Sequence, residues 1–519
     1  MPIHLKALVV ILAIAIVVFW IAKRPLCEFA MDEADFKRRR NVWFAVTLIA
    51  FLTPNFWFYA LFAGIVLAIA ASRERNPMAL FFLMLFAVPP FRDRIPGFGL
   101  INYVFELDYY RLLALTILLP AGYRLMQRRP EPHVGLQTAD RFFAGYVGLL
   151  VVLTFLASSM TNTLRQVFLM LIDMVLPYFV ASRSMRQLRD FKEAAACFVL
   201  AAVLLAGAAV FETVRHWLLY SSLAEAMGLS WEGGLYLSRG DETGPLRALG
   251  STAHSIVLGY MMVVALGLFV YLSGSLRVRI VRWLAWIALV AGLVATFSRG
   301  PLLGGAVGLV VGLGLGSKGP KRLAQFFVCG GIVFACLLLT PWSDAVIDYL
   351  PFFGSGGVES VTYRQRLFEV SISVLLQNPF FGAFDSLLNS ALEELRQGQG
   401  IIDLVNSYIG VALSTGFIGL TLFVGIFFTA AISVLRARRY VMIVDPDGEA
   451  LGRSLLATLA GIMITIATAS NVNAISLVYW TVAGLCVAYV RVIISEQGSQ
   501  DVPMPVGRGF TAARAHAGL

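Results

Sequence analysis

Thr362-Tyr363-Arg364-Gln365-Arg366-Leu367 opens a polar segment that closes on Ser414-Thr415-Gly416-Phe417-Ile418-Gly419, between two hydrophobic regions of the chain. Asn378-Pro379-Phe380-Phe381-Gly382 and Val405-Asn406-Ser407-Tyr408 lie between these two ends. Most of the remaining chain is apolar enough to lie in a membrane. Loops held on a rigid scaffold commonly carry function. We therefore expect the chemistry of the protein to lie in or beside this polar segment.

The composition decides the class of protein. Hydrophobic residues make up 59% of the 519 residues, and charged residues make up only 14%. This is too little polar surface for a water-soluble globule of this size. The composition predicts an all-α polytopic integral membrane protein.

Apolar runs predict where the chain crosses the membrane. A spanning helix needs about 20 mostly apolar residues, and the chain supplies enough runs for about fourteen spans, within a range of about 12–15. The run at 77–90 is short enough to be re-entrant instead. The expected spans are 4–22, 41–53, 56–72, 77–90, 106–124, 141–158, 165–181, 193–211, 252–272, 283–298, 301–316, 323–341, 407–434, 454–470 and 475–493.

We expect three parts along the chain. Residues 1–200 form N-terminal transmembrane helices, and residues 201–493 form a transmembrane core with a long, partly helical outer loop at 342–406. Residues 494–519 form a disordered cytoplasmic tail. Residues 361–376 have arginines near their start and are apolar at Leu367, Val370, Ile372, Leu375 and Leu376. This pattern predicts an amphipathic helix that lies on the membrane surface with these residues on one face and that Asn378-Pro379 ends.

The basic loops indicate the orientation. Lys and Arg concentrate on the cytoplasmic side of membrane proteins, and the basic loops all fall on one face in this list of spans. The loops at 91–105, 212–251 and 342–406 then share the outer face, which is the periplasm in a Gram-negative cell. The net charge of +10 thus reflects the orientation of the chain in the membrane, and we expect no nucleic-acid partner. The basic loops are 23–40, 124–129, 183–192, 277–282, 318–322 and 436–453.

Several arginines fall outside those basic loops. Arg299 stands between two apolar spans, where an ionisable side chain is costly and commonly functional. Arg239 and Arg247 end the second outer loop, and Arg364 and Arg366 lie in the third. The planar guanidinium matches two phosphate oxygens and keeps its charge. Together these arginines predict an anion site at the outer surface, although each one alone is equally well explained as a side chain that reaches the headgroups or solvates a loop.

Short motifs in this region carry a resemblance to a known family. The chain resembles the O-antigen ligase and Wzy-type polymerase superfamily in five short motifs that occur in this order: Ser298-Arg299-Gly300, Tyr363-Arg364-Gln365-Arg366-Leu367, Asn378-Pro379 with Gly382, Asn406-Ser407-Tyr408 and Gly416-Phe417-Ile418-Gly419. Upstream, Phe211-Glu212, Arg247-Ala248-Leu249-Gly250, His254 and Leu258-Gly259-Tyr260 resemble the exopolysaccharide polymerase branch. The resemblance covers roughly residues 200–490.

The resemblance implies glycosyl transfer at the periplasmic face of the bacterial inner membrane, from an undecaprenyl-pyrophosphate-linked glycan to an acceptor hydroxyl. It implies membrane lipids, a flippase and a chain-length regulator as partners, and no cofactor, nucleotide sugar or metal. No Asp-x-Asp cluster for a divalent cation occurs in the outer loops, so arginine would stabilise the departing pyrophosphate. The expected catalytic residues are Arg299, Arg364, Arg366 and Asp403, and the expected substrate-binding residues are Arg247, Arg239, His254, Asn406, Tyr408 and Tyr363.

The chain departs from the ligase pattern at one position. Ligases of this family usually carry His directly before the residue that corresponds to Asn406, and here Val405 stands there. An apolar side chain cannot accept a proton, so a polymerase is the first hypothesis, a ligase the second and a lipid-linked oligosaccharide flippase the third. The candidates for the general base are Asp403, Asp385, Glu369 and His254. Asp403 is explained equally well as an acidic residue before a helix, and His254 as a packed residue at a helix start.

Overall fold

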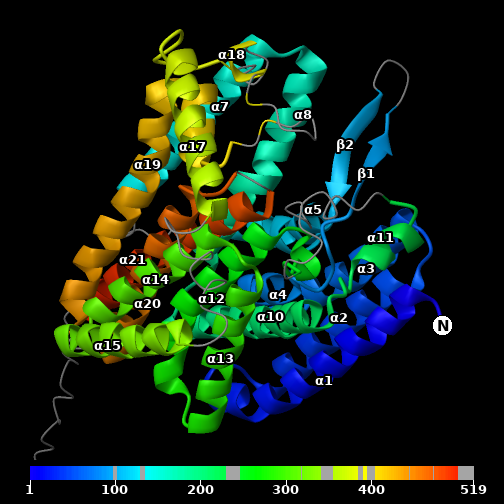
Figure 1. The fold of residues 1–519 in the computed structure, drawn as a ribbon, viewed down its shortest axis with the longest axis vertical. Coiled ribbons are helices and arrows are strands. Elements are labelled where there is room, and N and C mark those ends of the chain that lie inside the picture. The colour runs from blue at the N-terminus through cyan, green and yellow to red at the C-terminus, as the bar shows by residue number, and fades with distance from the viewer. Residues whose placement is uncertain are drawn as a thin grey trace, which may run out of the picture.

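The computed structural model of the protein describes residues 1–97, 102–128, 135–229, 246–316, 318–339, 355–383, 390–393, 395, 402, 404–442, 445–470 and 473–500. Figure 1 shows a bundle of helices from which a two-stranded hairpin projects. Eight helical segments of the described part are long and apolar enough to cross a membrane. The protein is an all-α, multi-pass membrane protein, as its composition predicts.

The first part of the chain forms helices that overlap the predicted spans. Two of the predicted membrane spans, 106–124 and 165–181, each contain one π-helical turn. These turns are η1 (Ala114–Leu118) in the first span and η2 (Leu171–Val175) in the second. Each π-helical turn comes just before a proline, which lacks the N–H that a regular helix needs. The helices are α1 (Ile3–Phe29), α2 (Glu33–Leu52), α3 (Phe56–Ser72), α4 (Pro77–Met84), α5 (Tyr109–Leu113), α6 (Leu119–Met126), α7 (Thr138–Ala157), α8 (Met160–Met170), α9 (Leu176–Ser184), α10 (Leu188–Arg215) and α11 (Ser221–Ala226).

The second part begins with the short 3₁₀ turn η4 (Gly250–Thr252). Its helices are α12 (Ser255–Ser275), α13 (Arg279–Ala295), α14 (Arg299–Gly314), α15 (Gly319–Leu338), α17 (Ser355–Leu375), α18 (Ser390–Glu393), α19 (Ser407–Val441), α20 (Pro446–Ile466) and α21 (Asn473–Gln500).

The structure corrects two of the predictions made from the sequence. Helix α4 has eight residues and is buried throughout, so at about 12 Å it is too short to cross a bilayer. Helix α21 continues to Gln500, so the first residues of the predicted tail are helical.

Polar caps explain where several helices begin. The side chain of Asn76 accepts a hydrogen bond from the Ala79 amide at the start of α4. Gln137 and Gln187 each form a capping box, at the starts of α7 and α10. Asp445 accepts from the Asp447 amide at the start of α20. Each cap satisfies amide groups that the first helical turn leaves without partners.

Ion pairs join basic loops that the sequence assigns to one face. Asp32, in the first basic loop, pairs with Arg189 of the third at 3.0 Å. Lys192, at the end of that third loop, pairs with Asp447 of the last one at 3.0 Å. These loops therefore lie on the same face of the bundle, as predicted. We call it the basic face.

The hairpin was not predicted. Strand β1 (Arg92–Pro96) lies in the expected loop at 91–105 and pairs antiparallel with β2 (Tyr103–Asp108), which continues into the predicted span 106–124. Arg165 of α8 donates to the Tyr103 and Val104 carbonyls of β2, at 2.6 Å and 2.8 Å. Strand β1 alternates exposed and half-buried residues, so its sequence resembles an ordinary loop, whereas the second half of β2 is mostly buried.

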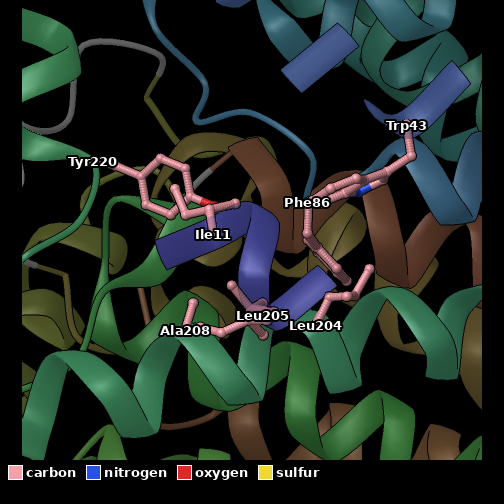
Figure 2. Close-up of a pocket in the computed structure, with 8 residues that line it drawn as sticks. Ile11, Trp43, Phe86, Leu204, Leu205, Ala208 and Tyr220 are labelled. Atoms are coloured by element: carbon pink, nitrogen blue, oxygen red, sulfur yellow. The ribbon is translucent and has the colours of Figure 1, made fainter. Parts of the chain in front are cut away.

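The N-terminal helices pack closely against α10. Figure 2 shows the point where α1, α2 and α10 meet, with Ile11, Trp43, Phe86, Leu205 and Tyr220 around a small gap. The gap has a volume of about 10 Å³, which is about the space of one water molecule. The end of α10 that lies away from the basic face carries the first part of the candidate site.

Candidate functional site

The loop between α13 and α14 holds the side chain of Arg247. The Arg247 Nε donates to the Thr296 carbonyl at 3.3 Å, and a terminal nitrogen donates to Ser298 Oγ at 2.8 Å. The Ala248 amide also donates to the Ala295 carbonyl, at 3.0 Å. Arg299 follows Ser298 directly as the first residue of α14. The structure therefore brings two of the predicted arginines to one loop, although they lie far apart in the sequence.

The carboxylate of Glu212 anchors the segment that carries Arg247. Glu212 is buried at the outer end of α10, and its oxygens accept from the Leu249 and Gly250 amides at 2.9 Å and 2.8 Å. The same carboxylate accepts from the Leu219 amide at 3.0 Å. Glu212 thus holds both ends of the second outer loop against α10.

Three residues with positive φ surround this region. His216, Ala253 and Phe297 have φ values of 50°, 59° and 46°, and among the described residues no other non-glycine has a positive φ. His216 ends α10 near Glu212, Ala253 precedes His254, and Phe297 precedes Ser298. Such backbone conformations cost on the order of 1–3 kcal/mol each and concentrate at functional sites. The strain therefore supports a function for this part of the molecule.

Glycines of α14 fix the direction in which Arg299 starts its helix. Gly300, Gly304 and Gly308 recur at four-residue spacing and face α20. A Cβ atom at Gly304 would lie 2.8 Å from the Gly461 carbonyl oxygen, and one at Gly308 would lie 2.9 Å from the Ala457 carbonyl oxygen. Such small-residue stripes let membrane helices approach closely. Because the backbones touch, α14 cannot rotate to carry Arg299 away.

The start of α19 is tied to the same end of α20. A side chain at Gly300 would collide with Thr468, and Ser407 Oγ donates to the next carbonyl, that of Ala469, at 2.8 Å. The Asn406 side chain accepts from the Tyr408 amide at 2.9 Å as the cap of α19. The segments around Arg247, Arg299 and Asn406 therefore converge through the residues that follow α20.

Helix α19 is broken at Gly416. Gly416 has φ 67° and ψ −168°, a region that is essentially restricted to glycine. The segment 378–382 fills the break: a Cβ at Gly416 would lie 2.5 Å from the Phe381 nitrogen. A Cβ at Gly382, which also has positive φ, would lie 2.7 Å from the Gly416 nitrogen. Both glycines are required because two backbones meet without side chains between them.

The inserted segment replaces the hydrogen bonds that the break removes. In a regular helix the Phe417 amide would donate to the Leu413 carbonyl. Here the Leu413 carbonyl accepts from the Ala383 amide at 2.8 Å, and the Phe417 amide donates to the Pro379 carbonyl at 2.8 Å. The next amide of α19 donates to the following carbonyl of the segment at 3.2 Å. The interlocked segments thus account for two of the motifs, 378–382 and 414–419.

Helix α17 confirms that residues 361–376 are helical, and Figure 1 shows it beside the first part of α19. Its buried face is Leu367, Val370, Ser371, Val374 and Leu375. Ile372 and Leu376, expected on that face, are exposed. They line a cavity of about 330 Å³ between α17 and α19, together with the side chains of Asn406 and Tyr408.

Part of this region matches a known protein family. Residues 283–424 match the family model described as O-Antigen ligase. These residues are similar to the O-antigen ligase family, and we call them the ligase domain. No curated protein matches the chain. The domain begins in α13 and ends within α19, so it contains the α14 start, α17 and the Gly416 break. Arg247 contacts it from outside, and Glu212 holds the segment that carries Arg247.

His254 lies beside the ligase domain as the cap of α12. Its Nδ1 accepts from the Ile256 amide at 3.2 Å, so in the neutral ring the proton is on Nε2. Burial, and then the nearby Arg247 guanidinium, lower the pKa of His254 to about 4. A neutral imidazole with its proton on Nε2 donates a hydrogen bond there rather than accepting a proton. This geometry favours His254 as a donor to an anion over His254 as the general base.

The other predicted residues have different surroundings. Arg364 and Arg366 lie on the exposed side of α17, where Arg366 pairs with Glu369 at 3.6 Å. Tyr363 packs against the buried face of α17. The Tyr408 hydroxyl donates to the Met463 carbonyl of α20 at 3.0 Å, which is a structural contact. Arg239, Asp403 and Asp385 lie outside the described residues, and roles in binding or catalysis for all these side chains stay predictions.

Sequence reasoning missed the residues that place the arginines. Glu212 was noted only as part of a motif, and Ser298 only as a neighbour of Arg299. Thr468 was not noted at all. A glutamate close to the end of an apolar span was the available signal for Glu212, because a carboxylate at that depth must find donors.

Proposed function

We propose that the protein is a polysaccharide polymerase. In this proposal it transfers a glycan from an undecaprenyl-pyrophosphate carrier to a sugar hydroxyl of a lipid-linked repeat unit, at the membrane face opposite the basic face. The observation that carries the proposal is the anchoring of Arg247 on Ser298, directly before Arg299, at the edge of the ligase domain. The basic face would be cytoplasmic and the transfer periplasmic, in the bacterial inner membrane.

The reaction would use fixed positive charge. The acceptor oxygen attacks the anomeric carbon, the bond from that carbon to the pyrophosphate oxygen breaks, and negative charge develops on the pyrophosphate. Guanidinium groups held in place before the reaction stabilise this charge without reorganising. The Arg247 guanidinium is held by two hydrogen bonds, and the packing of α14 on α20 fixes the backbone position of Arg299. Arg364 and Arg366 would approach from α17, and His254 Nε2 would donate a further hydrogen bond.

The absence of a histidine at Val405 supports a polymerase over a ligase. Glu369 is paired with Arg366, and the geometry of His254 favours a donor, so Asp403 and Asp385 remain as candidate bases. This proposal prefers Asp403, which lies closer in the sequence to Asn406. A flippase, a chain-length regulator and the lipid-linked glycan would be the partners of the protein.

Replacing Arg299 tests the proposal. Arg299→Ala should abolish chain extension, and Arg299→Lys should lose much of it, because the ammonium keeps the charge but not the planar fork. The matched control is Arg215→Ala, at the exposed outer end of α10. The lipid-linked products should be analysed at equal protein level: a lost polymerase leaves single repeat units on the carrier, and a lost ligase leaves long chains on it. Normal chain length in Arg299→Ala would exclude this mechanism.

A further inference from the structure

An apolar cleft lies at the opposite end of the bundle from the candidate site. Helices α1 and α13 both pack against α10, and the cleft is the space between them, with a volume of about 260 Å³. Figure 1 shows α1 and α13 on the same side of α10. All the side chains that line the cleft are apolar, among them Leu26 and Phe29 of α1 and Leu284 of α13. Apolar cavities of this size stay dry and accept apolar ligands.

The cleft is deep enough for part of a lipid chain. On α1 its lining extends from Val18 to Phe29, with Leu26 between them, and the step from Val18 to Leu26 alone is about 12 Å of helix. Small side chains on three helices, Ala22, Ala196 and Ala285, leave the space open. The lining would therefore surround an extended hydrocarbon chain along most of the thickness of one leaflet, which is about 15 Å.

Cationic side chains stand at the mouth of the cleft, on the basic face. Leu276 and Val281 line the cleft, so Arg277 and Arg279 lie at its rim, and both are exposed. Within the part of the chain that the structure describes, neither arginine has an ion-pair partner. Arg282 donates to the Ser273 carbonyl at 3.4 Å and so bridges α12 and α13 beside them. An apolar cleft with a cationic rim matches a molecule with a hydrocarbon tail and an anionic head.

We propose that this cleft binds an anionic phospholipid, with one acyl chain between α1 and α13 and the phosphate at Arg277 and Arg279. The proposal does not depend on the proposed polymerase activity, because the site lies on the other membrane face. The lipid fills the space that the two helices leave over α10. Bound lipid should therefore stabilise the protein as well as associate with it.

Native mass spectrometry of the delipidated full-length protein tests the proposal, with dimyristoylphosphatidylglycerol and dimyristoylphosphatidylcholine as probes. The wild type should retain the phosphatidylglycerol in preference, and this lipid should raise the midpoint of thermal unfolding. Arg277→Gln with Arg279→Gln should weaken phosphatidylglycerol binding on the order of tenfold. Ala285→Phe should weaken binding of both lipids, because the ring fills the cleft.

Two control variants distinguish this site from general attraction to the membrane. Arg436→Gln with Arg439→Gln removes the same charge from exposed positions of α19 outside the cleft lining. Ala291→Phe adds the same ring to α13 outside that lining. Both controls should bind phosphatidylglycerol as the wild type does. Equal retention of the two lipids by the wild type, or equal loss in the control and cleft arginine pairs, would overturn the proposal. The arginine pair remains a test even where Ala285→Phe does not fold, because both arginines are exposed.

Discussion

Gly416→Ala should separate the two segments that interlock at the break in α19. The added Cβ would lie 2.5 Å from the Phe381 nitrogen, so segment 378–382 has to leave the break. The separation removes three hydrogen bonds between the segments, worth about 3 kcal/mol together. The expected loss of stability is therefore about 3 kcal/mol.

The midpoint of thermal unfolding in detergent measures this loss, and the length of the polysaccharide product measures activity. Gly410→Ala is the matched control, because it lies in the same helix and its added Cβ would meet only Leu404, at an ordinary 3.7 Å. The control should be neutral or slightly stabilising, since alanine favours a helix over glycine. If Gly416→Ala matched Gly410→Ala in midpoint and activity, the interlock would not hold the fold.

Three further predictions concern other parts of the molecule. Glu212→Ala leaves three backbone amides without their acceptor, each costing about 1–3 kcal/mol when buried, so it should lower the unfolding midpoint and activity, whereas Glu225→Ala should do neither. His254 has a folded pKa of about 4 against an ordinary 6.5, so the stability that its neutral form provides is present above pH 6.5 and is lost as the pH falls toward 4. His254→Asn keeps a side-chain acceptor for the α12 cap and should reduce the fall in unfolding midpoint between pH 7 and pH 5; an unchanged fall would contradict the assigned pKa. A reporter enzyme fused after Ser355 should be exported and one fused after Asp445 should remain cytoplasmic, and the reverse pattern would remove the basis for a periplasmic site.

The helices were predictable because the membrane imposes a local rule. A span must be long and apolar, and this property can be read from consecutive residues. Helix α17 was predictable for a related reason, since its apolar residues recur at helical spacing. The predicted buried face of α17 was only partly correct, because Ile372 and Leu376 line a cavity instead of packing in the core. The side that packs on α19 depends on the partner helix, which the pattern of one segment does not specify.

The break in α19 and the Glu212 anchor were not predictable, because each depends on contacts between distant residues. Gly416 follows a run that is apolar enough for a continuous helix, and only the approach of segment 378–382 shows why glycine is required there. The partners of the Glu212 carboxylate are backbone amides. Every residue except proline has such an amide, so the sequence carries no sign of which ones are used.

The contacts explain why short motifs occur together in this chain. Segment 378–382 and segment 414–419 are two sides of one interlocked contact. Arg247 and Ser298 are joined by a side-chain hydrogen bond, and a Cβ at Gly259 would lie 2.7 Å from Pro301 Cβ. A change in one member of such a pair removes the contact partner of the other, so the two motifs of a pair are required together. The Arg247–Ser298 and Gly259–Pro301 contacts lie at the start of α14, beside Arg299, and they explain why the motifs before α12 and those at the start of α14 occur in one chain.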